Sequence, residues 1–198
     1  MSVFNLNTQN ENLDNKIVAG LERLTQAFRT LLWDKAKEYG LSPIQIQILI
    51  FLRYHSHDKA TVSYLAKEFN LTKPTISDAI KALEQKKLIE KLSDNSDNRS
   101  YSIILTEPGI AIVTHTEDFI NPVSHIVSAI DPGQKESVWK AISTLIITLN
   151  KAGVISTQRT CPNCKYFSPT NKAPYCSLLN KKLEPSDIRI DCFEFEHI

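Results

Sequence analysis

Residues 72–83 carry apolar side chains at helical spacing, with small polar and basic side chains on the opposite face. Ile76, Ile80 and Leu83 recur at i, i+4 and i+7, which makes one apolar stripe. Thr72 can cap the first turn, and Pro74 is tolerated there because early helical N–H groups lack intrahelical partners. The opposite face presents Lys73, Thr75, Ser77, Asp78 and Lys81. Any amphipathic surface helix fits this pattern, so the neighbouring segments decide whether it is a helix for a DNA groove.

Two helices are predicted before this one. Ser42-Pro43 reads as the N-cap and first residue of a helix, although the alternation in residues 44–48 also suits a strand. We choose a helix because its neighbours form a helical pattern. Residues 61–69 form a second, short helix, and Asn70 is a good terminator. The order helix, tight turn, helix follows.

A β-hairpin is predicted after residue 87. Residues 88–92 alternate in polarity, residues 93–98 are turn formers throughout, and residues 99–105 supply a returning strand. A helix-turn-helix followed by such a hairpin is a winged helix.

Long amphipathic helices flank this unit. Residues 13–36 carry an apolar stripe and Gly40 supplies the stop. Residues 109–130 are predicted to form one helix kinked at Pro122, and residues 132–149 a final helix capped by Asp131. These helices have more apolar surface than one domain can cover, which favours packing on another subunit.

Composition limits the class of protein. The 198 residues have a net charge of only +1, so any contact with DNA must depend on locally placed Lys and Arg. No apolar run approaches the roughly 18 residues that span a membrane, and the N-terminal residues lack a signal-peptide pattern. We expect a cytoplasmic protein without a membrane partner.

All four cysteines follow Thr160, in a tail rich in Cys, Pro and Asn. A Cys-x-x-Cys pair and two later cysteines can complete a tetrahedral site, and so short a tail needs a metal to fold. The predicted ligands are Cys161, Cys164, Cys176 and Cys192. Zinc is the first choice, an iron–sulfur cluster takes the same four thiolates, and reduced thiols in a loose tail are the simpler alternative.

Several short motifs together resemble the MarR family of winged-helix transcription regulators. The most specific are Asp97-Asn98-Arg99 and Leu105-Thr106-Glu107-Pro108-Gly109. The resemblance implies a homodimer on a palindromic duplex, with the recognition helix in the major groove. It also implies that Arg99 reaches the minor groove and that Asp97 fixes the wing. Lys87 departs from the family pattern, which usually has Gly where the recognition helix ends in a left-handed conformation.

The predicted fold is mainly α with a small β-hairpin wing: a winged helix-turn-helix, flanked by long dimerisation helices and followed by a Cys-rich metal-binding tail. The boundaries are 1–40 for the N-terminal dimerisation helix, 41–105 for the winged helix, 106–153 for the C-terminal dimerisation helices and 157–198 for the tail. Predicted DNA contacts are Lys73, Thr75, Ser77, Lys81, Asp97 and Arg99.

The predicted function is a non-enzymatic, homodimeric repressor of MarR type, tuned by a small-molecule effector or by its metal or redox tail. The alternative is a metal- or thiol-dependent redox enzyme that uses the cysteines, with the winged helix as a scaffold. Cys-x-x-Cys is compatible with thiol exchange, but no βαβ pattern accompanies it.

Overall fold

The structure is a computed structural model that describes residues 2–94, 97–169 and 173–198, without the side chains of residues 93–100. The chain begins with the short helix α1 (Leu6–Gln9) and the long helix α2 (Leu13–Glu38). Gly40 follows α2 at φ +61°, as expected for a helix stop. No helix among the described residues is both long enough and apolar enough to cross a membrane.

The predicted winged helix is present. Its helices are α3 (Pro43–Tyr54), α4 (Val62–Glu68) and α5 (Lys73–Gln85), with a 3-10 turn, η1 (His57–Lys59), between the first two. The wing pairs β1 (Ile89–Asp94) with β2 (Asp97–Leu105) in antiparallel register, so that Ile89 faces Leu105. The fully buried side chains at the centre are Ile46, Ile48, Leu49, Leu65, Ile76, Ile80, Leu83, Ile89 and Ile103.

Helix α3 confirms the choice of a helix over a strand for residues 44–52. Ser42 and Gln45 form a capping box, in which each side chain bonds the other residue's backbone N–H. Pro43 occupies the first turn, where its missing N–H has no cost. The cap therefore decided this segment, whereas the local alternation was misleading.

The prediction of one kinked helix over residues 109–130 was wrong. The segment forms α6 (Glu107–Thr116), a 3-10 turn η2 (Glu117–Ile120) and α7 (Asn121–Ser128). Pro122 has no N–H for the carbonyl of Asp118, and its ring would clash with that carbonyl in a continuous helix. The interruption therefore precedes the proline, which lies in the first turn of α7.

Helix α8 (Pro132–Lys151) is capped by Asp131, as predicted, and leads into the tail. The tail contains the 3-10 turns η3 (Cys161–Asn163) and η4 (Pro185–Asp187). Its small sheet has the order β3-β4-β5, from β3 (Phe167–Ser168), β4 (Tyr175–Cys176) and β5 (Lys181–Lys182).

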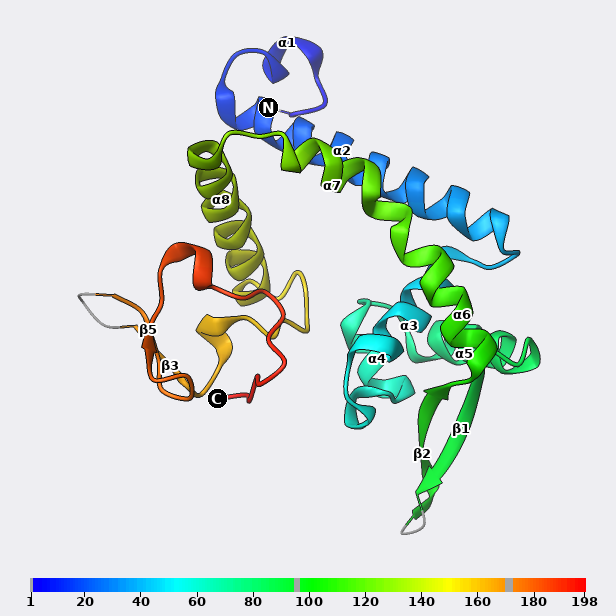
Figure 1. The fold of residues 1–198 in the computed structure, drawn as a ribbon. Helices are drawn as coiled ribbons and strands as arrows, with labels where there is room; N and C mark the ends of the chain where they lie inside the picture. The colour runs from blue at the N-terminus through cyan, green and yellow to red at the C-terminus, as the bar shows by residue number, and fades with distance from the viewer. Residues whose placement is uncertain (1, 95–96, 170–172) are drawn as a thin grey trace.

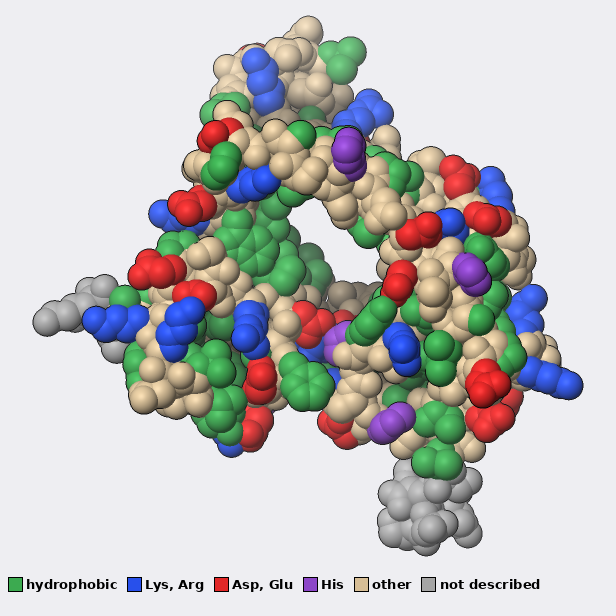
Figure 2. Space-filling model, viewed as in Figure 1, with side chains coloured by type: hydrophobic (Ala, Val, Ile, Leu, Met, Phe, Trp, Pro, Cys, Tyr) green, Lys and Arg blue, Asp and Glu red, His purple; other side chains and the backbone are tan. Residues whose placement is uncertain are grey.

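The elements enclose an opening. In Figure 1, α2 and α7 run along the top, α8 descends on one side and the winged helix lies on the other. The tail lies below α8, beside α4, and Figure 2 shows the opening left in the middle. The tail therefore has two neighbours, α8 and the winged helix.

Candidate DNA interface and cysteine pocket

Helix α5 buries one face and exposes the other. Ile76, Ala79, Ile80 and Leu83 are buried, as the apolar stripe predicted. Thr72 caps the helix by accepting the N–H of Thr75 at 3.3 Å. The predicted contacts Lys73, Thr75 and Lys81 are exposed, and Ser77 is half-buried. The structure thus brings these four side chains onto one helix, mostly on its solvent side.

The turns on either side of α5 use left-handed backbone. Asn70 precedes it at φ +51°, a conformation that Asn tolerates better than most residues. Lys87 follows it at φ +57°, so the chain keeps the left-handed turn without the glycine. The chain therefore leaves α5 through a left-handed lysine, at a cost of about 1 kcal/mol.

The sequence Thr106-Glu107-Pro108-Gly109 joins the wing to α6. The Thr106 hydroxyl donates to the carbonyl of Lys87 at 2.7 Å and accepts the N–H of Gly109 at 3.2 Å. A Cβ on Gly109 would lie 2.0 Å from the carbonyl oxygen of Leu88, so only glycine fits. This motif holds the base of the wing against the end of α5.

The wing extends away from the helices. Its β1–β2 ladder continues to the pair Asp94 and Asp97. The backbone places Asp97 and Arg99 at the start of β2, but their side chains lie outside the described part of the chain. Their predicted roles in DNA binding therefore stay predictions.

Comparisons of sequence and of structure agree on the winged helix. Residues 39–100 match the sequence profile of the MarR family. A crystal structure of the S. aureus MepR–DNA complex matches with 26% identity and a TM-score of 0.59, covering 67% of this chain and 97% of that one. Residues 39–100 are therefore a winged-helix domain similar to those of the MarR family. We refer below to residues 39–100 as the MarR domain.

Two further solved structures share the fold of the MarR domain and its flanking helices. The MarR family transcription regulator SP03579 has a TM-score of 0.62 at 19% identity, covering 70% of this chain and 91% of that one. The transcriptional regulator PA3341 has a TM-score of 0.58 at 22% identity, covering 68% and 98%. No curated protein matches the chain. About a third of the chain thus has no counterpart in these structures.

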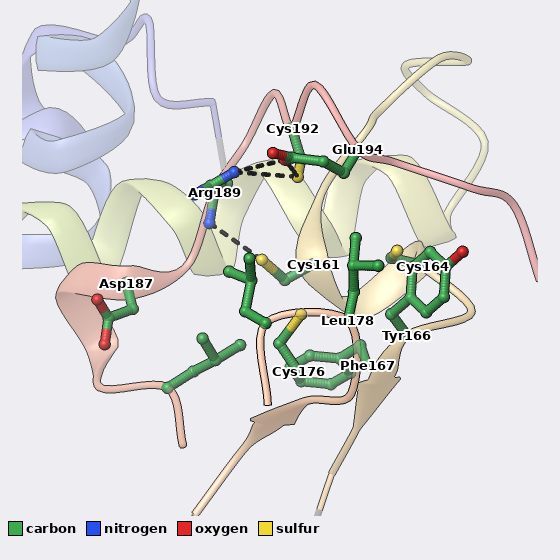
Figure 3. A pocket seen from close by; sticks show the side chains of 12 residues that line it. Cys161, Cys164, Tyr166, Phe167, Cys176, Leu178, Asp187, Arg189, Cys192 and Glu194 are labelled. Atoms are coloured by element: carbon green, nitrogen blue, oxygen red, sulfur yellow. Dashed lines mark hydrogen bonds and ion pairs between the residues drawn. The ribbon is translucent and has the colours of Figure 1, made fainter. Parts of the chain in front are cut away.

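The four cysteines line one pocket in the tail, together with apolar side chains such as Leu178 and Leu183. The pocket encloses a cavity of about 30 Å³. In the view of Figure 3, Leu178 separates Cys164 from the other cysteines. Across residues 2–94, 97–169 and 173–198, no three Cys, His, Asp or Glu side chains are gathered closely enough to hold one metal ion. The four cysteines therefore share a pocket, while the tetrahedral metal site stays a prediction.

Two of these thiols receive N–H groups. The backbone N–H of Arg189 lies 3.2 Å from the sulfur of Cys161, and its guanidinium lies 3.5 Å from that of Cys192. Burial raises the pKa of both thiols, although these contacts oppose the rise. Reactive thiols have a lowered pKa, unlike these two.

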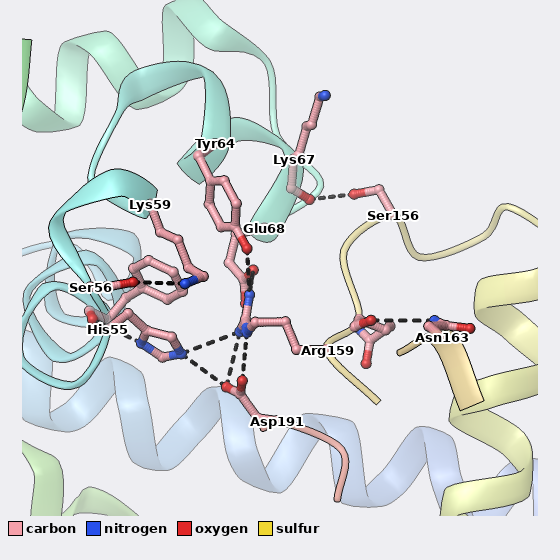
Figure 4. Close-up of polar contacts among 12 residues, drawn as sticks. His55, Ser56, Lys59, Tyr64, Lys67, Glu68, Ser156, Arg159, Asn163 and Asp191 are labelled. Atoms are coloured by element: carbon pink, nitrogen blue, oxygen red, sulfur yellow. Dashed lines mark hydrogen bonds and ion pairs between the residues drawn. The ribbon is translucent and has the colours of Figure 1, made fainter. Parts of the chain in front are cut away.

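Sequence analysis missed an ionic cluster around the buried Arg159, between the tail and α4. Arg159 is 4% exposed and makes two bonds to Glu68, NH1 to Oε2 at 2.7 Å and NH2 to Oε1 at 3.0 Å. It makes two more to Asp191, Nε to Oδ1 at 2.5 Å and NH2 to Oδ2 at 2.9 Å, and one to the hydroxyl of Tyr64 at 3.0 Å. Figure 4 shows these contacts converging on the guanidinium. We call Arg159, Glu68 and Asp191 the clamp.

His55, in the loop after α3, lies beside the clamp. Its ring stacks on Phe51 at 3.9 Å, and its Nε2 lies 2.9 Å from Oδ2 of Asp191. Burial alone would raise the pKa of Asp191, but the hydrogen bonds from His55 and Arg159 hold it well below its usual range. The only sequence signals were Arg-Thr-Cys at residues 159–161 and Asp-Cys at residues 191–192, and neither indicates a partner by itself.

Proposed function

We propose that this protein is a homodimeric repressor that binds a palindromic DNA duplex. The observation that carries the proposal is the exposed polar face of α5. This helix is capped at its start, buries its apolar face and lies beside the wing. In this arrangement α5 enters the major groove and the wing reaches the adjacent minor groove. Lys73 and Lys81 contact phosphates, while Thr75 and Ser77 are short enough to approach base edges. The S. aureus MepR–DNA complex supports this assignment by its similarity.

The second subunit covers two apolar stripes. On α2, Ile17, Leu21, Leu24 and Phe28 are 37–55% exposed. On α8, Val138, Ile142, Leu145 and Leu149 recur at i, i+4, i+7 and i+11 and are 39–45% exposed. Exposing contiguous apolar faces of this kind to water is unfavourable in a lone subunit, and such faces mark protein interfaces. A two-fold dimer would place two α5 helices about 34–36 Å apart, one turn of DNA.

The tail holds a thiophilic metal centre, with zinc the first candidate and an iron–sulfur cluster the alternative. The donor set fits both, because Cys161, Cys164, Cys176 and Cys192 line one apolar pocket. The cavity of about 30 Å³ has the size of a single ion or water. N–H groups directed at two of the sulfurs would stabilise thiolates there. Zinc, when bound, would take the four sulfurs as thiolates, so its binding would release the thiol protons.

A redox enzyme is the weaker candidate. It would need an activated thiolate, whereas burial raises the pKa of Cys161 and Cys192.

Tuning of the regulator by a small effector would use a cleft between the MarR domain and the dimerisation helices. We place the tuning in the tail instead, for the reasons given below.

Selection of duplexes from a random pool tests DNA binding. We expect a palindromic consensus, and binding that Arg99→Ala weakens at physiological salt. Lys140→Ala on α8 is the control, because this exposed residue lies away from α5 and the wing. No preference over random DNA would overturn the regulator.

Elemental analysis and an absorption spectrum of anaerobically purified protein test the metal. Zinc without visible absorption supports the first candidate, and iron with visible absorption supports the second. A protein that contains no zinc and no iron would overturn both candidates.

A further inference from the structure

We propose that the cysteine tail is a metal-dependent brace that fixes the MarR domain to helix α8 and thereby sets the affinity for DNA. This inference rests on the proposed function, since it assigns a regulatory use to the four-cysteine pocket. Metal binding holds together the two tail segments that carry Arg159 and Asp191. The completed clamp then grips Glu68 on α4.

The clamp is the stronger of two contacts on the MarR domain. Arg159 bonds Glu68 through two parallel N–H···O contacts, a geometry that gives orientation as well as energy. Its guanidinium also lies over the ring of Phe51, 5.5 Å from the centroid. Removing one partner from a buried pair leaves an uncompensated charge. The tail therefore docks in one orientation or leaves the surface.

The second contact lies at the turn before α5. The N–H of Ser156 donates to Oδ1 of Asn70 at 3.0 Å, and the Ser156 hydroxyl donates to the carbonyl of Lys67. Asn70 is the left-handed residue of the helix-turn-helix turn. The residue just before the tail thus touches the segment that positions the recognition helix.

The other side of the tail is attached to α8. The indole N–H of Trp139 donates to the carbonyl of Pro185 at 2.9 Å, and Asn163 donates to Oδ1 of Asn150 at 2.8 Å. Residues of α8 also form the apolar stripe assigned to the second subunit. A docked tail therefore connects the dimer platform to the MarR domain of the same chain.

The clamp and the cysteine ligands share the same backbone. Asp191 directly precedes Cys192, and Arg159 lies two residues before Cys161. The N–H of Cys192 donates to the carbonyl of Arg159 at 3.1 Å, and the N–H of Cys161 donates to that of Arg189 at 3.1 Å. A metal that ties Cys161 to Cys192 closes this pair of segments.

Without a metal the tail has only a small apolar core of its own. Leu183 and Cys164 are its only buried apolar residues within the described chain. So small a core does not support a fold of this length. Loss of the metal therefore opens the tail and withdraws Asp191 from the clamp.

The docked tail leaves the DNA-facing side of α5 free, since Lys73, Thr75 and Lys81 stay exposed with the clamp closed. Docking restricts the motion of the MarR domain before DNA binds. DNA binding then loses less conformational entropy, so the affinity for DNA is higher. The metal-loaded protein is accordingly the form that binds DNA more tightly, and loss of the metal releases the operator.

The test compares the full chain as a zinc-loaded and a chelator-stripped, reduced protein on its selected duplex. We expect loading to tighten binding about tenfold, within the usual range of coupling between sites. Arg159→Ala should still take up zinc but show less than about a twofold response. Lys181→Ala, which removes an exposed ion pair with Asp187 inside the tail, should keep the full response. Equal affinity of the loaded and stripped wild type, tighter binding by the stripped form, or a full response in Arg159→Ala would overturn the brace.

Hydrogen exchange separates this inference from the proposed function. Amides of residues 62–70 should exchange more slowly in the loaded wild type than in the stripped one, with no such difference in Arg159→Ala. Glu68→Gln provides a second variant if Arg159→Ala does not fold. Protection without any DNA binding refutes the regulator but leaves the tail docking intact, whereas DNA binding without protection refutes the brace alone.

Discussion

The hydroxyl of Thr106 donates to the carbonyl oxygen of Lys87 across 2.7 Å, joining the start of α6 to the left-handed residue that ends α5. The same hydroxyl caps α6 through Gly109. One side chain therefore fixes both the exit of α5 and the base of the wing. This contact compensates part of the strain of a lysine at φ +57°.

Replacing Lys87 by glycine should stabilise the protein. Lys87→Gly removes the left-handed strain and should raise the free energy of unfolding by about 0.5–1 kcal/mol, measured by urea denaturation. Lys86→Gly is a matched control, because Lys86 loses the same charge at φ −78° and should lower stability by a similar amount. A loss of stability in Lys87→Gly would contradict the strain.

Gly109 should not tolerate a methyl group. Gly109→Ala places a Cβ against the Leu88 carbonyl and should lower the free energy of unfolding by at least about 2 kcal/mol. The control is Gly20→Ala in α2, where no atom lies within 4 Å of the added Cβ and stability should rise. Thermal unfolding of both variants measures the difference, and equal melting temperatures would contradict the close approach.

Lys73 and Lys81 should contribute to DNA affinity without reading sequence. Each phosphate contact contributes about 0.9 to the slope of log K against log salt, so losing one lysine from both subunits should reduce that slope by about 1.8. Fluorescence anisotropy across a salt series measures the slope for Lys73→Ala and Lys81→Ala. An unchanged slope for both would place α5 away from the phosphates.

A charge in the apolar stripe of α2 should separate the subunits. Leu24→Asp puts a carboxylate where the second copy packs, and sedimentation velocity should show a shift to monomer. Gln26→Asp is the control, since Gln26 lies on the opposite side of the same helix and should leave the dimer intact. A Leu24→Asp protein that sediments like the wild type would mean that the stripe is not in the interface.

Local signals were enough to predict the winged helix, because helix caps and turns depend on residues only a few positions apart. Ser42 with Gln45, and Thr72 with Thr75, are separated by three positions and define where helices begin. The break before Pro122 was harder, since a proline acts on the carbonyl four residues earlier. Its position follows from that geometry rather than from the apolar pattern.

The clamp could not be predicted from local patterns. Arg159 meets a glutamate 91 positions earlier and an aspartate 32 positions later. Neither distance corresponds to a helical or strand period, and His55 looks like any polar loop residue until its partner is known. The four cysteines were easier to single out as candidate site residues, because only a few kinds of site use four thiols at such spacing.

The hydrogen bond between Trp139 and Pro185 gives the molecule a built-in optical reporter. The chain has two tryptophans, and the other, Trp33, lies on α2 and is 52% exposed. In a Trp33→Phe protein, all indole emission would come from the junction of α8 and the tail. Its wavelength and intensity would follow the seating of residues 157–198 in real time, with no dye attached.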